Sequence, residues 1–376
     1  MIPLNPNLSG LQRSAIRRFT NLANATPGCI KLTIGEPDFD TPQPIKDAAA
    51  AALAAGMTHY APNQGLPALR QAVADYETRR GMACKPEQVL ITLGATGALY
   101  TALTGILSPG DEVIVPTPAF VLYESIITAA GAKMVALDIS KTGFQIEKEG
   151  LNALLSPKTK AIILNSPNNP TGVILNESSL AAVKDAVLER NIWLLCDNVY
   201  QLLAQGGCPD LSLDEDLREQ TFLCQSFSKP YAMTGWRAGY LVGPEKVMER
   251  LLLLHAAMVA SVPTFVQQAC IEALKWDTAE MAAVYARRRQ LVSRRLRAMG
   301  LRFPEPGGAF YAFADISPCG LDSETFCTRL IREGGVAAVP GACFGAEGYI
   351  RISCACSDEA LEEGLNRLEK FVKSLR

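Results

Sequence analysis

Two serine hydroxyls, a lysine and an arginine fall within twelve residues of one segment, SFSKPYAMTGWRAGYLVG, which runs from residue 226 to 243 between two predicted strands. Lys229 is the only lysine in this segment. Burial in a cleft beside Arg237 would lower the pKa of the Lys229 ammonium, and the neutral amine would then be a nucleophile for a carbonyl group. Ser226, Ser228 and Arg237 are hydrogen-bond donors of the kind that surround a phosphate. The segment therefore predicts a nucleophilic lysine next to an anion site.

A second pair of polar residues follows a buried strand. Asp197 comes directly after the apolar run IWLLC, so it is expected at the carboxyl end of a strand, where open α/β sheets bind their ligands. Tyr200, in DNVY, is close enough in sequence to contact the same ligand from a second direction. The structural alternative is an aspartate that only caps the next turn.

Two turns at the same sheet edge add groups that can bind oxygen atoms or anions. NSPNNPTG, residues 165–172, follows the strand AIILN, and its side-chain amides can hydrogen-bond a ligand; the alternative is a rigid turn without this role. LGATGAL, residues 93–99, follows a strand and opens a helix, so the backbone N–H groups of Ala95 and Thr96 would point at an anion. In the lysine segment, Gly235 is expected to permit a close backbone approach.

Short apolar runs alternate with helical patterns over residues 89–243, which predicts a doubly wound α/β domain with a parallel sheet. Helical spacing covers residues 98–107 and 180–189, and Ser178 or Ser179 is the expected N-cap of the second helix. The expected strands are Val89–Thr92, Glu112–Val115, Lys133–Leu137, Ala161–Leu164, Ile192–Cys196, Thr221–Gln225 and Gly239–Val242.

Beyond about residue 280 the pattern changes and predicts a second, smaller α+β domain. It comprises a long helix through Arg297, a helix from Ser323, a closing helix, and strands near residues 309–314, 336–339 and 349–353. The cluster Arg287–Arg289, followed by Arg294 and Arg295, is expected on the solvated face of the long helix. The stretch LTIGEPDFDTP ends an N-terminal segment that is expected to reach the small domain or to line a cleft.

The composition argues against several classes of function. With 376 residues, of which 48% are hydrophobic and 20% charged, the chain is expected to form two globular domains. The net charge is -2 and the sequence has no long run of like charges, so it gives no sign of a basic surface that would bind nucleic acid or an anionic membrane. The absence of a signal-peptide pattern and of a long apolar stretch predicts a cytoplasmic location. Eleven cysteines without a CxxC pair and only two histidines predict neither a metal site nor a disulfide framework.

The motifs IGEPDFDTP, YAPNQGLPALR, LGATGAL, PTPAF, NSPNNPTG, DNVY, SFSK, MTGWRAGY and YIRIS occur in this order along nearly the whole chain. In this order they resemble the class I aminotransferases, enzymes of fold type I that use pyridoxal 5′-phosphate (PLP). The resemblance implies a large PLP-binding α/β domain, with a seven-stranded, mostly parallel sheet flanked by helices, and a smaller α+β domain. It also implies an N-terminal segment over residues 1–39 that joins the small domain, a large domain over 40–275 and a small domain over 276–376.

By the same resemblance, Lys229 holds PLP as an internal Schiff base and moves the proton between the substrate Cα and the cofactor. Asp197 pairs with the protonated pyridine nitrogen, and Asn169 and Tyr200 hydrogen-bond the ring hydroxyl oxygen. Phe120 stacks on the ring, at a position where many members have Trp or Tyr. Lys229, Asp197 and Tyr200 are the catalytic residues in this interpretation. The expected phosphate ligands are Ala95, Thr96, Ser226, Ser228, Arg237 and Tyr60, the last contributed across the interface of a homodimer.

The resemblance further implies a ping-pong exchange between an L-amino acid and a 2-oxo acid. Arg351 is expected to bind the substrate α-carboxylate, with Gly35 and Asn169 as further substrate contacts. The alternative is a C–S β-lyase or another α-carbon chemistry on the same fold, and a more distant one is a non-catalytic regulatory homologue. No metal is expected.

The chain departs from the family pattern in two places. Asn198 stands where an acidic residue is common, and the additional cation of the members that accept dicarboxylates has no evident counterpart in the sequence. The opening stretch LSGLQRSAIRRFTNLA is similar to a bacterial branch that includes aminotransferase A, which is associated with N-acetyl-diaminopimelate. The side chain of the substrate is therefore left open at this point.

Overall fold

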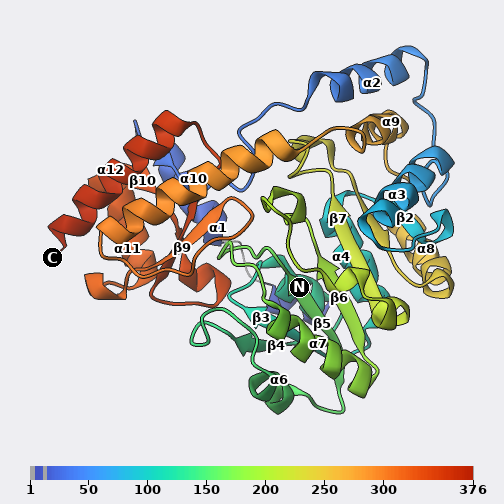
Figure 1. Ribbon diagram of the computed structural model, residues 1–376, viewed down its shortest axis with the longest axis horizontal. Coiled ribbons are helices and arrows are strands. Elements are labelled where there is room, and N and C mark those ends of the chain that lie inside the picture. Colours follow the sequence, from blue (N-terminus) through green and yellow to red (C-terminus); the bar gives the residue numbers. More distant parts are fainter. Residues whose placement is uncertain (1–4, 12–14, 376) are drawn as a thin grey trace.

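A computed structural model describes residues 5–11 and 15–375 of the chain, so the predicted N-terminal segment is described only in part. Its largest element is a seven-stranded sheet with the strand order β2-β8-β7-β6-β5-β3-β4, in which only β8 runs antiparallel to its neighbours (Figure 1). The strands are β2 (Val89–Thr92), β3 (Glu112–Thr117), β4 (Lys133–Asp138), β5 (Thr159–Asn165), β6 (Trp193–Asp197), β7 (Thr221–Ser226) and β8 (Gly239–Val242).

The apolar runs form central strands because both faces of the sheet are covered by helices. Along β3, Val113 and Val115 pack into one cluster with α4 (Gly94–Ile106), α5 (Leu122–Ala129) and α8 (Glu245–Val259). Ile114, between them, points to the other face. On that second face lie α6 (Lys148–Leu154) and α7 (Glu177–Arg190), and further along the sheet α3 (Pro67–Arg80) and α9 (Thr264–Ala273).

The seven expected strands and the doubly wound arrangement are confirmed, with ends that differ by at most two residues. The N-cap expected for the second helix is wrong: α7 begins after Asn176, whose side chain accepts a hydrogen bond from the backbone N–H of Ser179. Ser179 is therefore the N3 donor, and its fully buried hydroxyl hydrogen-bonds Gln145 instead.

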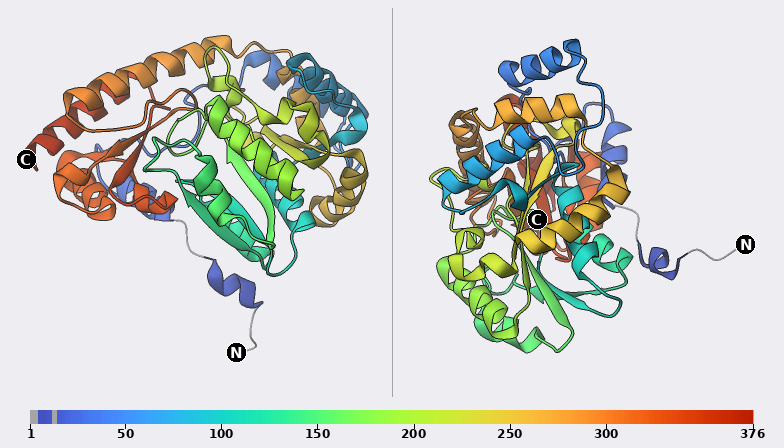
Figure 2. Two further views of the ribbon diagram at one scale, coloured as in Figure 1. Left: turned by 60° about the horizontal axis from the view of Figure 1, so that its bottom comes forward. Right: turned by 90° about the vertical axis from the view of Figure 1, so that its right-hand side faces the viewer.

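The C-terminal part forms a three-stranded antiparallel sheet, β11-β12-β9, next to the large sheet (Figure 2). The single strand expected at residues 336–339 is wrong, because the chain changes sheets there. β10 (Val336–Ala337) pairs in parallel with β1 (Ile30–Lys31), while β11 (Val339–Pro340) pairs with β12 (Tyr349–Ser353). The third strand is β9 (Tyr311–Asp315), and the helices are α10 (Ala279–Ala298), α11 (Ser323–Arg329) and α12 (Asp358–Ser374).

The expectation for the arginine cluster of α10 is wrong in part: Arg287 and Arg294 are exposed and Arg295 is half-buried, but two of the arginines are buried. Arg288 and Arg289 are 7% and 4% exposed, whereas Arg287 remains largely exposed. Arg288 forms ion pairs with Asp38 and Asp358, at 2.8 and 2.6 Å, and Arg289 donates to the carbonyl oxygen of Ala309 at 2.6 Å. A run of like charges can be buried in this way because each guanidinium finds acceptors from a different segment.

The N-terminal segment belongs physically to this C-terminal part. α1 (Ala15–Asn24) packs on it through the fully buried Phe19 and Ala23, and β1 completes a two-stranded sheet with β10. α2 (Gln43–Ala54) lies instead beside α9 at the far end of the large sheet (Figure 1). The boundaries at residues 39 and 275 stay a prediction. Among the described residues, no helix has the length and apolarity needed to cross a membrane.

Candidate active site

A cavity of about 710 Å³ opens where the carboxyl ends of β5, β6 and β7 face the small domain. These strands end at Asn165, Asp197 and Ser226, which all line it, as an open parallel sheet predicts. The cavity brings together almost all of the site residues expected from the sequence, the exception being Tyr60. They are Gly35, Ala95, Thr96, Phe120, Asn169, Asp197, Tyr200, Ser226, Ser228, Lys229, Arg237 and Arg351.

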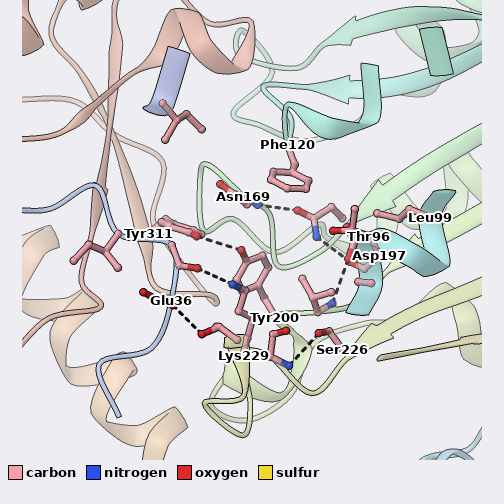
Figure 3. Close-up of a pocket in the computed structure, with 18 of the residues that line it drawn as sticks. Glu36, Thr96, Leu99, Phe120, Asn169, Asp197, Tyr200, Ser226, Lys229 and Tyr311 are labelled. Carbon is pink, nitrogen blue, oxygen red and sulfur yellow. Dashed lines mark hydrogen bonds between the residues drawn. The ribbon is translucent and has the colours of Figure 1, made fainter. Parts of the chain in front are cut away.

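Lys229 lines the cavity (Figure 3). Its Nζ donates a hydrogen bond of 2.6 Å to the carbonyl oxygen of Gly35. Burial lowers the pKa of the Lys229 ammonium to about 8, and Arg237 and Arg351 act in the same direction against the carboxylates of Glu36 and Asp197. The sequence predicted this lowering of the Lys229 pKa, and burial contributes more to it than the charge of Arg237 does. A considerable fraction of this amine is neutral near pH 8.

Asp197 is buried at the end of β6 and held by residues from two other elements. The hydroxyl of Tyr123, on α5, donates to its Oδ2 at 2.6 Å, and the side chain of Asn165 donates to its backbone carbonyl at 2.8 Å. Burial raises the pKa of Asp197 to about 6, and the hydrogen bond from Tyr123 opposes this shift. A cationic ligand atom beside the carboxylate would restore its ionised form.

The anion-binding end of the cavity is built on the N-terminus of α4. A Cβ atom on Gly239, in β8, would lie 2.7 Å from the backbone carbon of Gly94 and 2.9 Å from the backbone nitrogen of Ala95, so only glycine lets the helix approach this closely. Gly235 does not have the role expected of it, because nothing in the described part of the chain lies within 4 Å of its would-be Cβ. The glycine that permits close approach is four residues later.

Arg237 completes this end in a left-handed backbone conformation, with φ of 54°. Its Nη1 donates to the carbonyl oxygen of Thr234 at 3.0 Å. Such a conformation costs a non-glycine residue on the order of 1 kcal/mol, and residues of this kind cluster at ligand sites. Together with Ser226 and Ser228, both buried, it surrounds the first turn of α4 with donors suited to a phosphate.

Arg351 enters the cavity from β12 of the small domain. Its guanidinium lies over the rings of Tyr311 and Phe344, with centroid distances of 4.4 and 5.0 Å. Nη1 donates to Asn169 and Nη2 to the carbonyl oxygen of Thr33, at 3.0 and 2.9 Å. Its buried Nε has no partner among the residues that the structure describes. The arginine is therefore fixed by stacking and retains a free donor.

Three contributions to the site could not be read from the sequence. Tyr123 lies three residues after Phe120, in the first turn of α5, and Tyr311 hydrogen-bonds Tyr200 through their hydroxyls at 3.2 Å. The third is α1, which supplies Ile16, Arg17 and Thr20 to the cavity wall. For Tyr311 a signal existed, since it begins a strand paired with the strand of Arg351, but the pairing itself was unknown.

Tyr60 lies outside the cavity of its own chain. Its side chain is 90% exposed, on a surface that also includes His59, Pro263 and Phe265.

Comparison with known proteins identifies the family. The family of class I and II aminotransferases matches residues 27–368. The aromatic-amino-acid aminotransferase 2 of Thermococcus litoralis is 39% identical, with 98% of each chain covered. The probable N-acetyl-LL-diaminopimelate aminotransferase of Bacillus subtilis is 40% identical, over 99% of this chain and 96% of the relative. The structure of the aspartate aminotransferase from Thermus thermophilus with maleate superimposes with a TM-score of 0.93 at 37% identity, covering 99% and 100% of the two chains.

These three relatives are named for different substrate side chains although their identities to this chain are nearly equal. Overall identity therefore does not indicate which substrate side chain this chain accepts, while the fold and the reaction are shared. The chain belongs to the class I and II aminotransferases, PLP-dependent enzymes that move an amino group between an amino acid and a 2-oxo acid by a ping-pong mechanism.

Proposed function

We propose that Lys229, Asp197 and Arg351 each have a separate role in this transamination. The observation that carries the proposal is their meeting in one cavity. Lys229 comes from the turn after β7, Asp197 from the end of β6 and Arg351 from β12 of the smaller sheet. Lys229 supplies a nucleophilic amine, Asp197 a buried carboxylate and Arg351 a stacked guanidinium.

The residues present fit PLP. The donors around the first turn of α4 suit its phosphate, the Asp197 carboxylate suits its pyridine nitrogen, and Phe120 offers a ring to stack on. Asn169 and Tyr200 would bind the ring hydroxyl oxygen, and the Lys229 amine the aldehyde. When bound, the cofactor withdraws electrons from the α-carbon of the substrate.

Lys229 would hold and move the proton at the substrate Cα. A lysine with a pKa of about 8 can both accept and return a proton near neutral pH, which an exposed lysine cannot do efficiently. The Gly35 carbonyl oxygen, 2.6 Å from Nζ, provides an acceptor that directs the side chain. This contact also joins the N-terminal segment to the reacting group.

Arg351 would bind the α-carboxylate of both the amino acid and the 2-oxo acid. Its planar fork suits a carboxylate, and stacking between Tyr311 and Phe344 fixes the plane before substrate arrives. Asn169, which accepts from Nη1, and Gly35 would complete the contact. Ordering the site in advance lowers the entropic cost of binding.

The exposed Tyr60 supports a homodimer in which each subunit gives this residue to the phosphate site of the other. The cytoplasmic location and the similarity to the aminotransferase A branch stay predictions.

The test follows the visible absorbance of the cofactor in the purified holoenzyme while L-amino acids are added. A transaminase changes its spectrum with a suitable donor and recovers the starting spectrum only after a 2-oxo acid is added. A C–S β-lyase recovers it without a 2-oxo acid and releases a thiol and ammonia. Near-normal turnover in Lys229→Ala would contradict the role of Lys229.

A further inference from the structure

Two tyrosine hydroxyls from different parts of the fold meet in the cavity (Figure 3). Tyr200 follows β6 of the large sheet, and Tyr311 is the first residue of β9 in the smaller sheet. Their hydroxyl oxygens lie 3.2 Å apart, and both side chains are buried and line the cavity. In the proposed function Tyr200 binds the ring hydroxyl oxygen of the cofactor, whereas the Tyr311 hydroxyl has no assigned role.

Packing alone does not explain the Tyr311 hydroxyl. The ring is held by the guanidinium of Arg351 at 4.4 Å and by the ring of Phe310 at 4.8 Å, both measured between centres. A phenylalanine would make the same ring contacts. A buried hydroxyl is costly unless it is hydrogen-bonded, and Tyr200 is the one partner that the described part of the chain offers it. The hydroxyl is therefore present for its contact with Tyr200.

The direction of this hydrogen bond follows from the number of protons. Burial raises the pKa of both phenols, so each keeps its proton near neutral pH. When Tyr200 donates its proton to the ring hydroxyl oxygen of the cofactor, its own oxygen can only accept from Tyr311. The cation of Arg351 over the Tyr311 ring favours this order, because it makes the Tyr311 hydroxyl a stronger donor.

We propose that Tyr311 is a positioning residue for the cofactor, which donates to Tyr200 and so strengthens the bond that Tyr200 donates to the ring hydroxyl oxygen. Hydrogen bonds in a chain polarise one another in this way. Donors to the ring oxygen stabilise its negative charge, so they lower the pH at which the bound cofactor gains a proton. The inference rests on the proposed function, since it requires PLP in the cavity.

Other titratable and charged groups also act on this proton. Those that line the cavity or face the two phenols are Arg17, Glu36, Tyr123, Asp197, Lys229, Arg237, Arg351 and Cys354. Burial raises the pKa of the Cys354 thiol to about 12, so this group stays neutral. Tyr311→Phe leaves all of these groups in the protein and keeps a ring under Arg351. A shift in the titration of the cofactor would therefore report the hydroxyl.

The test titrates the visible absorbance of the purified holoenzyme with pH in the wild type, Tyr311→Phe, Tyr200→Phe and the double variant. In Tyr311→Phe we expect the midpoint to rise by roughly 0.3–1 pH unit, the size of one neutral hydrogen bond, and in Tyr200→Phe by about 1–2 pH units. The double variant should have the midpoint of Tyr200→Phe, because Tyr311 then has no hydroxyl to act through.

Tyr285→Phe is the matched control. It removes another buried phenol, which packs on the same Phe310 ring but hydrogen-bonds Asp38 outside the cavity, and it should leave the midpoint unchanged. A Tyr311→Phe variant with a lower melting temperature and an unchanged midpoint would reduce Tyr311 to a structural role and overturn the inference. Equal shifts on removing the Tyr311 hydroxyl with and without that of Tyr200 would also overturn it. Both results leave transamination intact, whereas a cofactor spectrum that no amino acid changes would overturn the proposed function.

Discussion

The hydroxyl of Tyr123 donates a 2.6 Å hydrogen bond to the carboxylate of Asp197, and both groups are buried at the base of the cavity. Burial alone would favour the neutral acid, whereas the cofactor site needs the carboxylate. The phenol opposes burial by stabilising the charged form. Tyr123, which lies outside the recognised motifs, thus limits the rise in the pKa of Asp197, which lies inside one.

Replacing Tyr123 by Phe removes this donor and should raise the pKa of Asp197 further. Because a carboxyl with a higher pKa loses its charge at a higher pH, the acidic limb of the kcat/KM profile should move to higher pH. At pH 6 we expect a roughly 10-fold fall in kcat/KM, the size of one hydrogen bond to a charged group. Tyr240→Phe is the control, since it removes an equally buried phenol that donates to Glu77 at 2.6 Å outside the cavity. An unchanged profile in Tyr123→Phe would exclude the coupling.

Asp197→Asn should stabilise the apoprotein while reducing activity by orders of magnitude. The pKa of Asp197 is raised from 3.8 to about 6, so the folded state binds a proton that the unfolded state has released, and stability falls as the pH rises between these values. Above pH 6 the buried carboxylate costs about 3 kcal/mol, which asparagine does not incur. The melting temperature of the apoprotein should therefore rise at pH 8 and change little at pH 3.5. A gain of the same size at both pH values would contradict this explanation.

The lowered pKa of Lys229 predicts how the apoprotein captures its cofactor. Only the neutral amine attacks an aldehyde, so the association rate of PLP should rise with pH through a midpoint of about 8 and then level off. Stopped-flow absorbance across this range measures the midpoint. Lys229→Ala should still bind the cofactor through the phosphate site, but without the pH-dependent step. A midpoint near 10.5, the ordinary lysine value, would show that burial does not act on this group.

Two glycines of the same segment provide a matched pair. In Gly239→Ala the new Cβ would meet the backbone of Gly94 and Ala95 at less than 3 Å and push α4 outward. We expect at least a 10-fold weaker affinity for PLP and a loss of stability of about 1–3 kcal/mol, typical of an overpacked core. Gly235→Ala, which meets open space, should change neither quantity measurably. Equilibrium titration of the apoprotein with PLP tests both variants.

The departure at Asn198 also leads to a prediction. Its Nδ2 donates to Asp210 at 3.0 Å, and Asp210 lies 3.7 Å from Arg80. An acidic residue at position 198 would face the Asp210 carboxylate inside the protein, so Asn198→Asp should lower the free energy of unfolding by about 1–3 kcal/mol. Denaturant titration should show that Asp210→Asn reverses much of this loss in the double variant, and additive losses would argue against a direct contact.

The sequence predicted the strands of the large sheet well because buried parallel strands are short, apolar and bounded by turn residues. The position of Asp197 followed from them, since a polar residue directly after such a strand has to lie at the edge of the sheet. Sequence periodicity does not distinguish a tyrosine that fills a core from one that serves a site. Tyr123 and Tyr311 were missed for this reason.

The arginines show a second limit. Arg289 is on a helix with other arginines, and this pattern predicts a surface residue. It is buried, and three backbone carbonyl groups from other segments accept hydrogen bonds from its guanidinium. Arg17 has the same local pattern and lines the cavity. The difference depends on which segments pack against the helix, and that information is not local to either residue.

The pairing of β1 with β10 joins residues that are separated by about 300 positions along the chain. During translation the strand at residues 30–31 emerges first and waits for its partner until almost all of the polypeptide has been made. The half of the cavity that carries Asp197 and Lys229 can form earlier, whereas the half that carries Arg351 is completed last. A nascent chain would therefore present a PLP site before it can close the substrate site, and ribosome-bound intermediates of this enzyme should capture cofactor before they can turn over substrate.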